Sequence, residues 1–123
     1  MKMQESPEDY LEAILILSER KQDVHSVDVA QFLGYTKPSV SVAMKRLREN
    51  GYVEMDEHGV LTLTDPGLAI ASKIYERHRV LTEYFKSIGV SPAIAERDAC
   101  RIEHVISDET FDRIKALKPL SES

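Results

Sequence analysis

The sequence predicts a mostly α-helical protein: an N-terminal winged helix-turn-helix with a small β-hairpin wing, followed by a C-terminal helical dimerisation domain. Two observations predict the first part. A pair of short amphipathic helices is joined by a glycine turn, and two short β-forming runs follow it directly. A long helical apolar pattern from residue 64 onward predicts the second part. We therefore expect the boundary near Thr64, with domains at 1–63 and 64–123.

The first helix is expected from Pro7 to about Arg20. Ser6 can cap its N-terminus, Pro7 suits the first helical position, and Asp9 at the third position can complete a capping box. Apolar residues at helical spacing supply its buried side, namely Tyr10, Leu11, Ile14, Leu15 and Leu17.

The next two helices carry the helix-turn-helix pattern. Ser26 can cap a short helix over Val27–Leu33, and Gly34 supplies the permissive backbone of a tight turn. Thr36 can cap the second helix, which should end near Asn50. The residues expected to face inward from the shorter helix are Val27, Val29, Ala30 and Leu33.

The second of these helices is locally basic. Residues 36–50 hold four Lys and Arg against one Glu, a net +3 in a chain of formal net charge -5. Phosphate contacts are expected at such a position, although solvated Lys and Arg also occur on ordinary helix pairs. The residues that we expect to contact DNA are Thr36, Lys37, Pro38, Ser39, Ser41, Lys45, Arg46 and Arg48.

A predicted β-hairpin favours the DNA-binding interpretation. The runs Tyr52–Met55 and Val60–Leu63 flank a polar turn, and a hairpin directly after a helix-turn-helix is typical of a winged helix. His58 lies at the tip of this hairpin, where we expect a wing residue near the DNA backbone or a solvated side chain rather than a metal ligand.

The C-terminal half is predicted to form three more helices. A long one runs from Thr64 to about Ile88, a second opens at Ser91-Pro92 and continues through the stretch around Cys100, and a third is capped by Ser107 and runs through Leu117. Few apolar residues are available to these helices alone. We therefore expect the unit to pair with its copy in a two-fold homodimer that presents two recognition helices to a palindromic operator.

Two short clusters carry groups that bind metals. If the stretch is helical, Cys100, Glu103 and His104 stand at i, i+3 and i+4, so a thiolate, a carboxylate and an imidazole share one face. The alternative is an exposed helix face with a half-buried cysteine. Asp9 and Glu12 likewise project together, and their alternative role is to compensate the dipole of the first helix.

Composition excludes several classes of protein. No apolar run approaches the roughly 18 residues of a membrane span, the N-terminus lacks the apolar core of a signal peptide, and one cysteine cannot form an internal disulfide. We therefore expect a cytoplasmic protein that does not enter a membrane. The sequence offers no separate general base, oxyanion donor or substrate-pocket signature, so we expect neither an enzyme nor a small-molecule substrate.

Four blocks of sequence resemble the diphtheria-toxin-repressor family of metal-dependent repressors, which includes iron-dependent and manganese transport regulators. The matching blocks are Pro7–Glu12, Thr36–Ser41, Arg77-His78-Arg79 and Ala99–Glu109. The resemblance covers nearly the whole chain, and the last block is its most specific part.

The resemblance implies one metal site between the first helix and the helical unit. Its ligands would be Asp9, Glu12, His78, Cys100, Glu103 and His104. Six ligands with four ionised acids favour two closely spaced divalent ions per subunit. Glu83 and Glu96 are either accessory ligands or solvated side chains.

The ligand set that the resemblance implies has a mixed metal preference. Asp9 and Glu12 match the manganese-type pattern, whereas Cys100 matches the iron-type pattern. Carboxylates suit Mn(II), and a thiolate shifts the preference toward Fe(II), Co(II) or Zn(II). The chain stops at Ser123, before the SH3-like domain of longer iron-type repressors, which favours the short manganese-type architecture.

The expected function is that of a repressor that senses Mn(II), binds operator DNA and represses metal-uptake genes. Two alternatives stay open at this stage. One is an Fe(II)-dependent repressor of the same family. The other is a metal-independent winged-helix regulator whose helical unit only dimerises.

Overall fold

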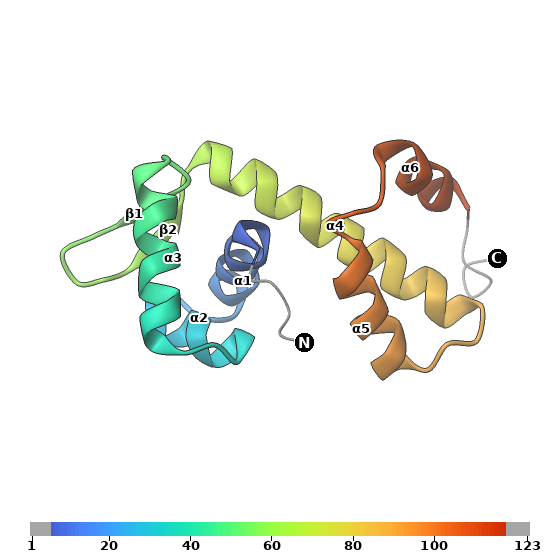
Figure 1. Ribbon diagram of the computed structural model, residues 1–123, viewed down its shortest axis with the longest axis horizontal. Helices are drawn as coiled ribbons and strands as arrows, with labels where there is room; N and C mark the ends of the chain where they lie inside the picture. The colour runs from blue at the N-terminus through green and yellow to red at the C-terminus, as the bar shows by residue number, and fades with distance from the viewer. Residues whose placement is uncertain (1–5, 118–123) are drawn as a thin grey trace. The chain divides into compact units, whose positions relative to one another are not determined.

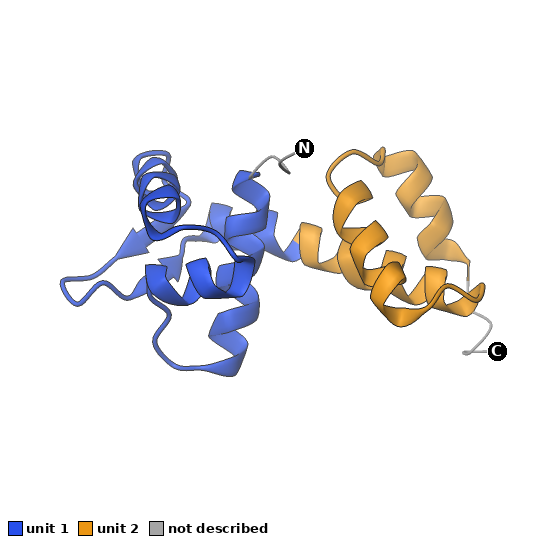
Figure 2. Ribbon diagram, turned by 60° about the horizontal axis from the view of Figure 1, so that its bottom comes forward, with its two compact units in different colours: residues 1–72 blue, residues 73–123 orange. Residues whose placement is uncertain are grey.

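The computed structural model describes residues 6–117, which form mostly helices and one two-stranded sheet, as predicted (Figure 1). The chain divides into two compact units, residues 1–72 and 73–123, and the division falls inside α4 (Figure 2). The expected domain boundary near Thr64 stays a prediction. The elements are α1 (Pro7–Arg20), α2 (Ser26–Leu33), α3 (Lys37–Glu49), β1 (Val53–Met55), β2 (Leu61–Leu63), α4 (Asp65–Ser87), α5 (Pro92–Ile102) and α6 (Asp108–Ala116).

The first unit packs α1, α2, α3 and the hairpin around one apolar core. Helix α1 begins where expected, because the Ser6 hydroxyl accepts a hydrogen bond from the backbone N–H of Glu8 at 3.1 Å. Leu15 and Leu17 are only partly buried and pack against the rim of the core. The centre consists of Tyr10, Leu11, Ile14, Val29, Val40, Met44, Leu47, Val53 and Leu61.

Helix α2 starts one residue earlier than predicted, so Ser26 is not its N-cap. His25 holds that position, and its backbone N–H donates to the Asp28 carboxylate at 2.8 Å. Val27 was wrongly expected to face inward; it is 39% exposed. It lies two residues before the buried Val29, which is about 200° around the helix axis and therefore on the opposite side.

The wing is an antiparallel hairpin in which Val53 pairs with Leu63, Glu54 with Thr62 and Met55 with Leu61. Its strands are shorter than predicted, and Tyr52 and Val60 lie outside them. The N–H of Leu61 donates to the carbonyl of Val24 at 2.8 Å, so the wing is tied to the segment between α1 and α2.

The first turn of α4, directly after the wing, requires a glycine at position 67. A Cβ on Gly67 would lie 2.1 Å from the backbone oxygen of Tyr52, which is far inside van der Waals contact. The side-chain oxygen of Thr64 accepts from the N–H of Gly67 at 3.2 Å and its hydroxyl donates to the Gly51 carbonyl at 2.7 Å. The first turn of α4 is therefore held against the end of α3 by backbone contacts that leave no room for a side chain.

The second unit packs the C-terminal part of α4 with α5 and α6 around Leu81, Ala99 and Phe111. Helix α5 ends at Ile102, so the helical arrangement considered for Cys100, Glu103 and His104 applies to Cys100 and stops short of His104. Glu103 is the C-cap and His104 lies in the following turn. Leu117 is likewise the C-cap of α6 rather than a helical residue, and it is 53% exposed.

None of the helices in residues 6–117 combines the length and the apolar composition needed to cross a bilayer.

Candidate functional site

The second unit contains a carboxylate that is completely buried between two imidazoles. The carboxylate belongs to Glu103, which has an exposed fraction of 0%. One of its oxygens, Oε1, lies 2.9 Å from Nδ1 of His78 on α4. The other, Oε2, lies 3.5 Å from Nε2 of His104 in the turn after α5. Three residues that the sequence predicted as ligands, on two different segments, are thus brought together within this unit.

The surroundings of Glu103 fit a divalent cation. No donor within residues 6–117 makes a hydrogen bond to its buried Oε2 atom, and an unsatisfied buried carboxylate oxygen is energetically unfavourable. Carboxylate and imidazole are a donor set that first-row divalent metals accept. His78 and His104 are each less than one-fifth exposed, so the three side chains form a largely enclosed donor group.

Arg77 fixes the chain segment that carries two of these donors. Its side chain is 6% exposed and donates to the backbone carbonyls of Glu103 at 3.0 Å and Ile106 at 2.8 Å, and to the carboxylate of Asp108. The guanidinium also lies 5.3 Å from the centre of the Phe111 ring. The backbone from residue 103 to residue 108 is therefore held to α4 by one side chain. Sequence reasoning missed this role, because only the fold shows where the arginine points.

The same segment includes an acid, Asp108, whose pKa is lowered by neighbouring cations. A hydrogen bond from Lys73 is the main cause that lowers the pKa of Asp108, and the contact with Arg77 lowers it further. Asp108 is therefore ionised at neutral pH and available as an acceptor for Arg77.

The remaining predicted donors of this unit differ in exposure. Cys100 is a half-buried thiol on α5, one turn before Glu103. Glu96 is 70% exposed and lies 3.9 Å from Nε2 of His78, within reach of the donor group. Glu83 is 52% exposed and accepts a hydrogen bond from Lys86 at 3.0 Å, which favours the solvated interpretation.

The first unit places Asp9 and Glu12 one turn apart on α1. Their exposed fractions are 8% and 9%, so both carboxylates are largely removed from solvent. Simple compensation of the helix dipole by solvated acids does not account for such burial, since charged side chains are seldom buried without partners. The two acids therefore remain candidates for metal binding.

Helix α3 exposes the basic face that the sequence predicted. Thr36 is its N-cap, and its hydroxyl accepts from the N–H of Ser39 at 3.3 Å. Ser39 is half-buried. The other predicted DNA contacts on this helix are exposed, namely Lys37, Pro38, Ser41, Lys45, Arg46 and Arg48.

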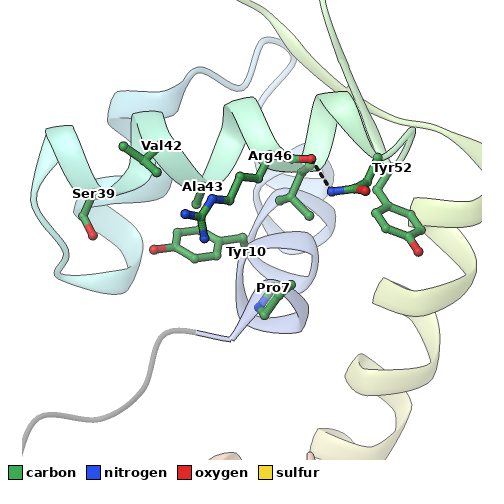
Figure 3. A pocket seen from close by; sticks show the side chains of 9 residues that line it. Pro7, Tyr10, Ser39, Val42, Ala43, Arg46 and Tyr52 are labelled. Carbon is green, nitrogen blue, oxygen red and sulfur yellow. Dashed lines mark hydrogen bonds between the residues drawn. The ribbon is translucent and has the colours of Figure 1, made fainter.

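A hollow of about 460 Å³ lies between α3 and the start of α1 (Figure 3). Ser39, Val42 and Arg46 contribute to it from α3, and Tyr10 contributes from α1. Val42 was not among the predicted contacts. At the tip of the wing, the His58 side chain is 79% exposed, in keeping with a solvated or backbone-contacting residue.

Comparison with known families gives two adjacent matches. Residues 2–61 match the model described as "Iron dependent repressor, N-terminal DNA binding domain". Residues 64–118 match the model described as "Iron dependent repressor, metal binding and dimerisation domain". Together the two models cover nearly the whole chain.

Individual relatives agree with these models. The chain is 37% identical over 108 residues to the transcriptional regulator MntR of Escherichia coli O6:H1, covering 88% of this chain and 70% of the relative. It is 32% identical to an uncharacterized HTH-type transcriptional regulator of Methanocaldococcus jannaschii, covering 92% of each chain. A solved manganese-dependent transcriptional repressor in complex with manganese superposes with a TM-score of 0.82 at 30% identity, over 90% of this chain. The chain spans about half the length of that structure, 51%.

Proposed function

This chain belongs to the iron-dependent repressor family, and from that premise we propose that it is a Mn(II)-responsive repressor of metal-uptake genes. The observation that carries the proposal is the buried Glu103 carboxylate, with His78 and His104 at its two oxygens. Such a group is poorly explained by packing alone and well explained by a bound cation.

We propose that the complete ligand set is the one that the resemblance implies. It combines donors from α1 with donors from the second unit: Asp9, Glu12, His78, Cys100, Glu103 and His104. The burial of both α1 acids and the unsatisfied Glu103 oxygen support this set. The four acidic groups match the charge of two divalent ions, so we propose two ions per subunit.

Metal binding would act on DNA binding through the mutual position of the two units. Without a cation, the carboxylates of Asp9, Glu12 and Glu103 would repel one another and leave the winged helix mobile. A bound Mn(II) ion supplies the positive charge that lets these carboxylates share one site. The recognition helices then lose less freedom on binding DNA, so metal and operator raise each other's affinity.

The DNA side of the proposal rests on α3. Lys37, Lys45, Arg46 and Arg48 present their charges to solvent and would contact phosphates, which position the protein without reading sequence. Thr36, Pro38, Ser39 and Ser41 lie at the helix start, where base edges are within reach. A chain that binds an operator acts in the cytoplasm, and its targets are double-stranded DNA rather than small-molecule substrates.

We propose that the protein acts as a homodimer formed by the second unit. Four apolar side chains of that unit are exposed in the single chain, and burying them would favour association with a copy. They are Ile88, Ile94, Val105 and Leu117.

The decisive test is an anaerobic titration of operator affinity against Mn(II), Fe(II), Co(II) and Zn(II), for the wild type and Glu12→Ala. The operator is first selected from a random duplex library with metal present. We expect Glu12→Ala to weaken metal-dependent binding by about tenfold or more, as loss of a metal ligand does, and to leave the dimer intact by analytical ultracentrifugation. Metal-dependent binding that is the same in both proteins would remove Glu12 from the site.

The same titration addresses the metal. Cys100→Glu replaces a thiolate by a carboxylate, so we expect the response to shift toward Mn(II) relative to Zn(II) and Co(II). An unchanged ranking of the four metals would show that the thiolate does not set selectivity. An operator affinity that is the same with and without chelator would instead support the metal-independent regulator.

A further inference from the structure

Helix α3 carries an apolar side chain in the middle of its basic outer face. The inner face is formed by the buried Val40, Met44 and Leu47. Val42 lies two residues from Val40, which is about 200° around the axis, and thus points away from the core. It is 56% exposed, the highest value among the exposed large hydrophobic side chains described in the first unit.

The neighbours of Val42 indicate what covers it. Pro38 and Ser39 lie one turn before it and Lys45 and Arg46 one turn after it, and the two cations are exposed (Figure 3 shows Ser39, Val42 and Arg46 along the helix). An apolar side chain between exposed cations is poorly suited to a protein core. It is well suited to a polyanion that presents an apolar group, and the thymine 5-methyl is the apolar group in the major groove of DNA.

We propose that Val42 reads sequence, by packing its methyl groups against the 5-methyl of a thymine in each operator half-site. This inference rests on the proposed function, because it needs α3 to enter the major groove. The Val42 contact with DNA would be apolar, whereas the basic and hydroxyl residues of the helix would make polar contacts. Lys45 and Arg46, one turn further along the helix, would contact phosphates, and Val42 would select a base beside them.

The test removes single methyl groups from the DNA. In the operator selected with wild-type protein and Mn(II), each thymine is replaced in turn by deoxyuridine, symmetrically in both half-sites. We expect one position at which the replacement weakens wild-type binding by about fourfold per half-site, the effect of one buried methyl group. At all other thymines the change should be small.

Variants then assign that methyl contact to Val42. In Val42→Ala the sensitive position should lose its response to deoxyuridine, whereas Val27→Ala, a change at an exposed valine on α2, should keep it. Val42→Thr retains one methyl group and should give an intermediate response. Circular dichroism melting of each variant checks that the fold is kept.

The outcomes separate the two proposals. If the wild type binds the operator with metal and no deoxyuridine replacement weakens that binding, the role of Val42 is overturned and the proposed repressor function stands. The same conclusion follows if Val42→Ala loses as much affinity as the wild type at the sensitive position. If no duplex is selected with any of the four metals, the proposed function fails and this inference fails with it.

Discussion

The two units treat charge in opposite ways. In the first, the basic side chains of α3 are exposed, and its apolar residues form the core behind them. In the second, the Glu103 carboxylate is fully buried and the apolar core lies beside it. Exposed charge contributes little to stability and is available to a large partner, whereas a buried charge is unfavourable unless a counter-charge reaches it. The comparison supports our proposal that α3 of the first unit meets the polyanion and that the buried carboxylate of the second unit takes part in holding the small cation.

The largest expected effect comes from removing the buried charge. Glu103→Gln keeps the shape of the side chain and removes its negative charge, so we expect affinity for Mn(II) to fall at least about a hundredfold, beyond the range for groups that only support a ligand. Isothermal titration calorimetry measures the affinity, and a thermal melt in chelator checks that the variant folds.

The matched control is Glu96→Gln, which alters a carboxylate that is 70% exposed. We expect it to change the affinity only slightly. Equal losses in the two variants would contradict the distinction between buried and exposed carboxylates on which the comparison depends.

A smaller effect is expected at the side chain that holds the donor segment in place. Arg77→Lys keeps the positive charge but cannot reproduce the forked hydrogen bonds to the carbonyls of Glu103 and Ile106. We expect the second unit to lose about 2 kcal/mol of stability. Metal affinity should fall about tenfold, because Glu103 and His104 would no longer be pre-positioned.

Arg79→Lys is the control for this change. Arg79 is exposed, and its guanidinium lies 5.3 Å from the centre of the Tyr75 ring. Metal titration followed by hydrogen exchange at residues 103–108 compares the variants. If Arg77→Lys destabilises the protein and leaves metal affinity as in Arg79→Lys, Arg77 supports the fold and not the donor group.

The sequence predicted most of this fold because its signals are local. Proline and hydroxyl caps mark the starts of α1 and α3, and a glycine with φ of 74° ends α2. The errors arose where a local signal had a competitor. The Asp28 carboxylate accepts the N–H of His25 and so makes His25 the N-cap, which is why α2 begins at Ser26 rather than at Val27.

The site was less accessible to sequence reasoning. Spacing identified Glu103 and His104, but the helical stripe considered for them holds only as far as Glu103, the C-cap of α5, and His104 lies in the turn that follows. The contact between His78 and Glu103 joins residues 25 positions apart and follows only from tertiary packing. Resemblance to a family supplied His78 as a donor, and the structure supplied its distance to the carboxylate.

The smallest expected effect concerns an exposed acid of the first unit, Asp56, in the turn of the wing. Its carboxylate accepts from the N–H groups of Val60 at 2.9 Å and His58 at 2.8 Å. The bond from Val60 is the main cause that lowers the pKa of Asp56 below the ordinary value of an aspartate carboxyl. A lowered pKa means that the stabilisation is fully present above about pH 4 and is lost as the pH falls through the lowered value.

Asp56→Asn should therefore speed hydrogen exchange of the Val60 amide at neutral pH without affecting the second unit. Glu57→Gln, at an adjacent side chain that is 86% exposed, is the control. The difference between Asp56→Asn and the wild type should shrink only as the pH falls through the lowered pKa of Asp56, because the wild-type carboxyl then becomes neutral like the amide. A difference that persists at low pH would show that shape, rather than charge, orders the wing. Exposed charge would then matter even less in the first unit than the comparison with Glu103 implies.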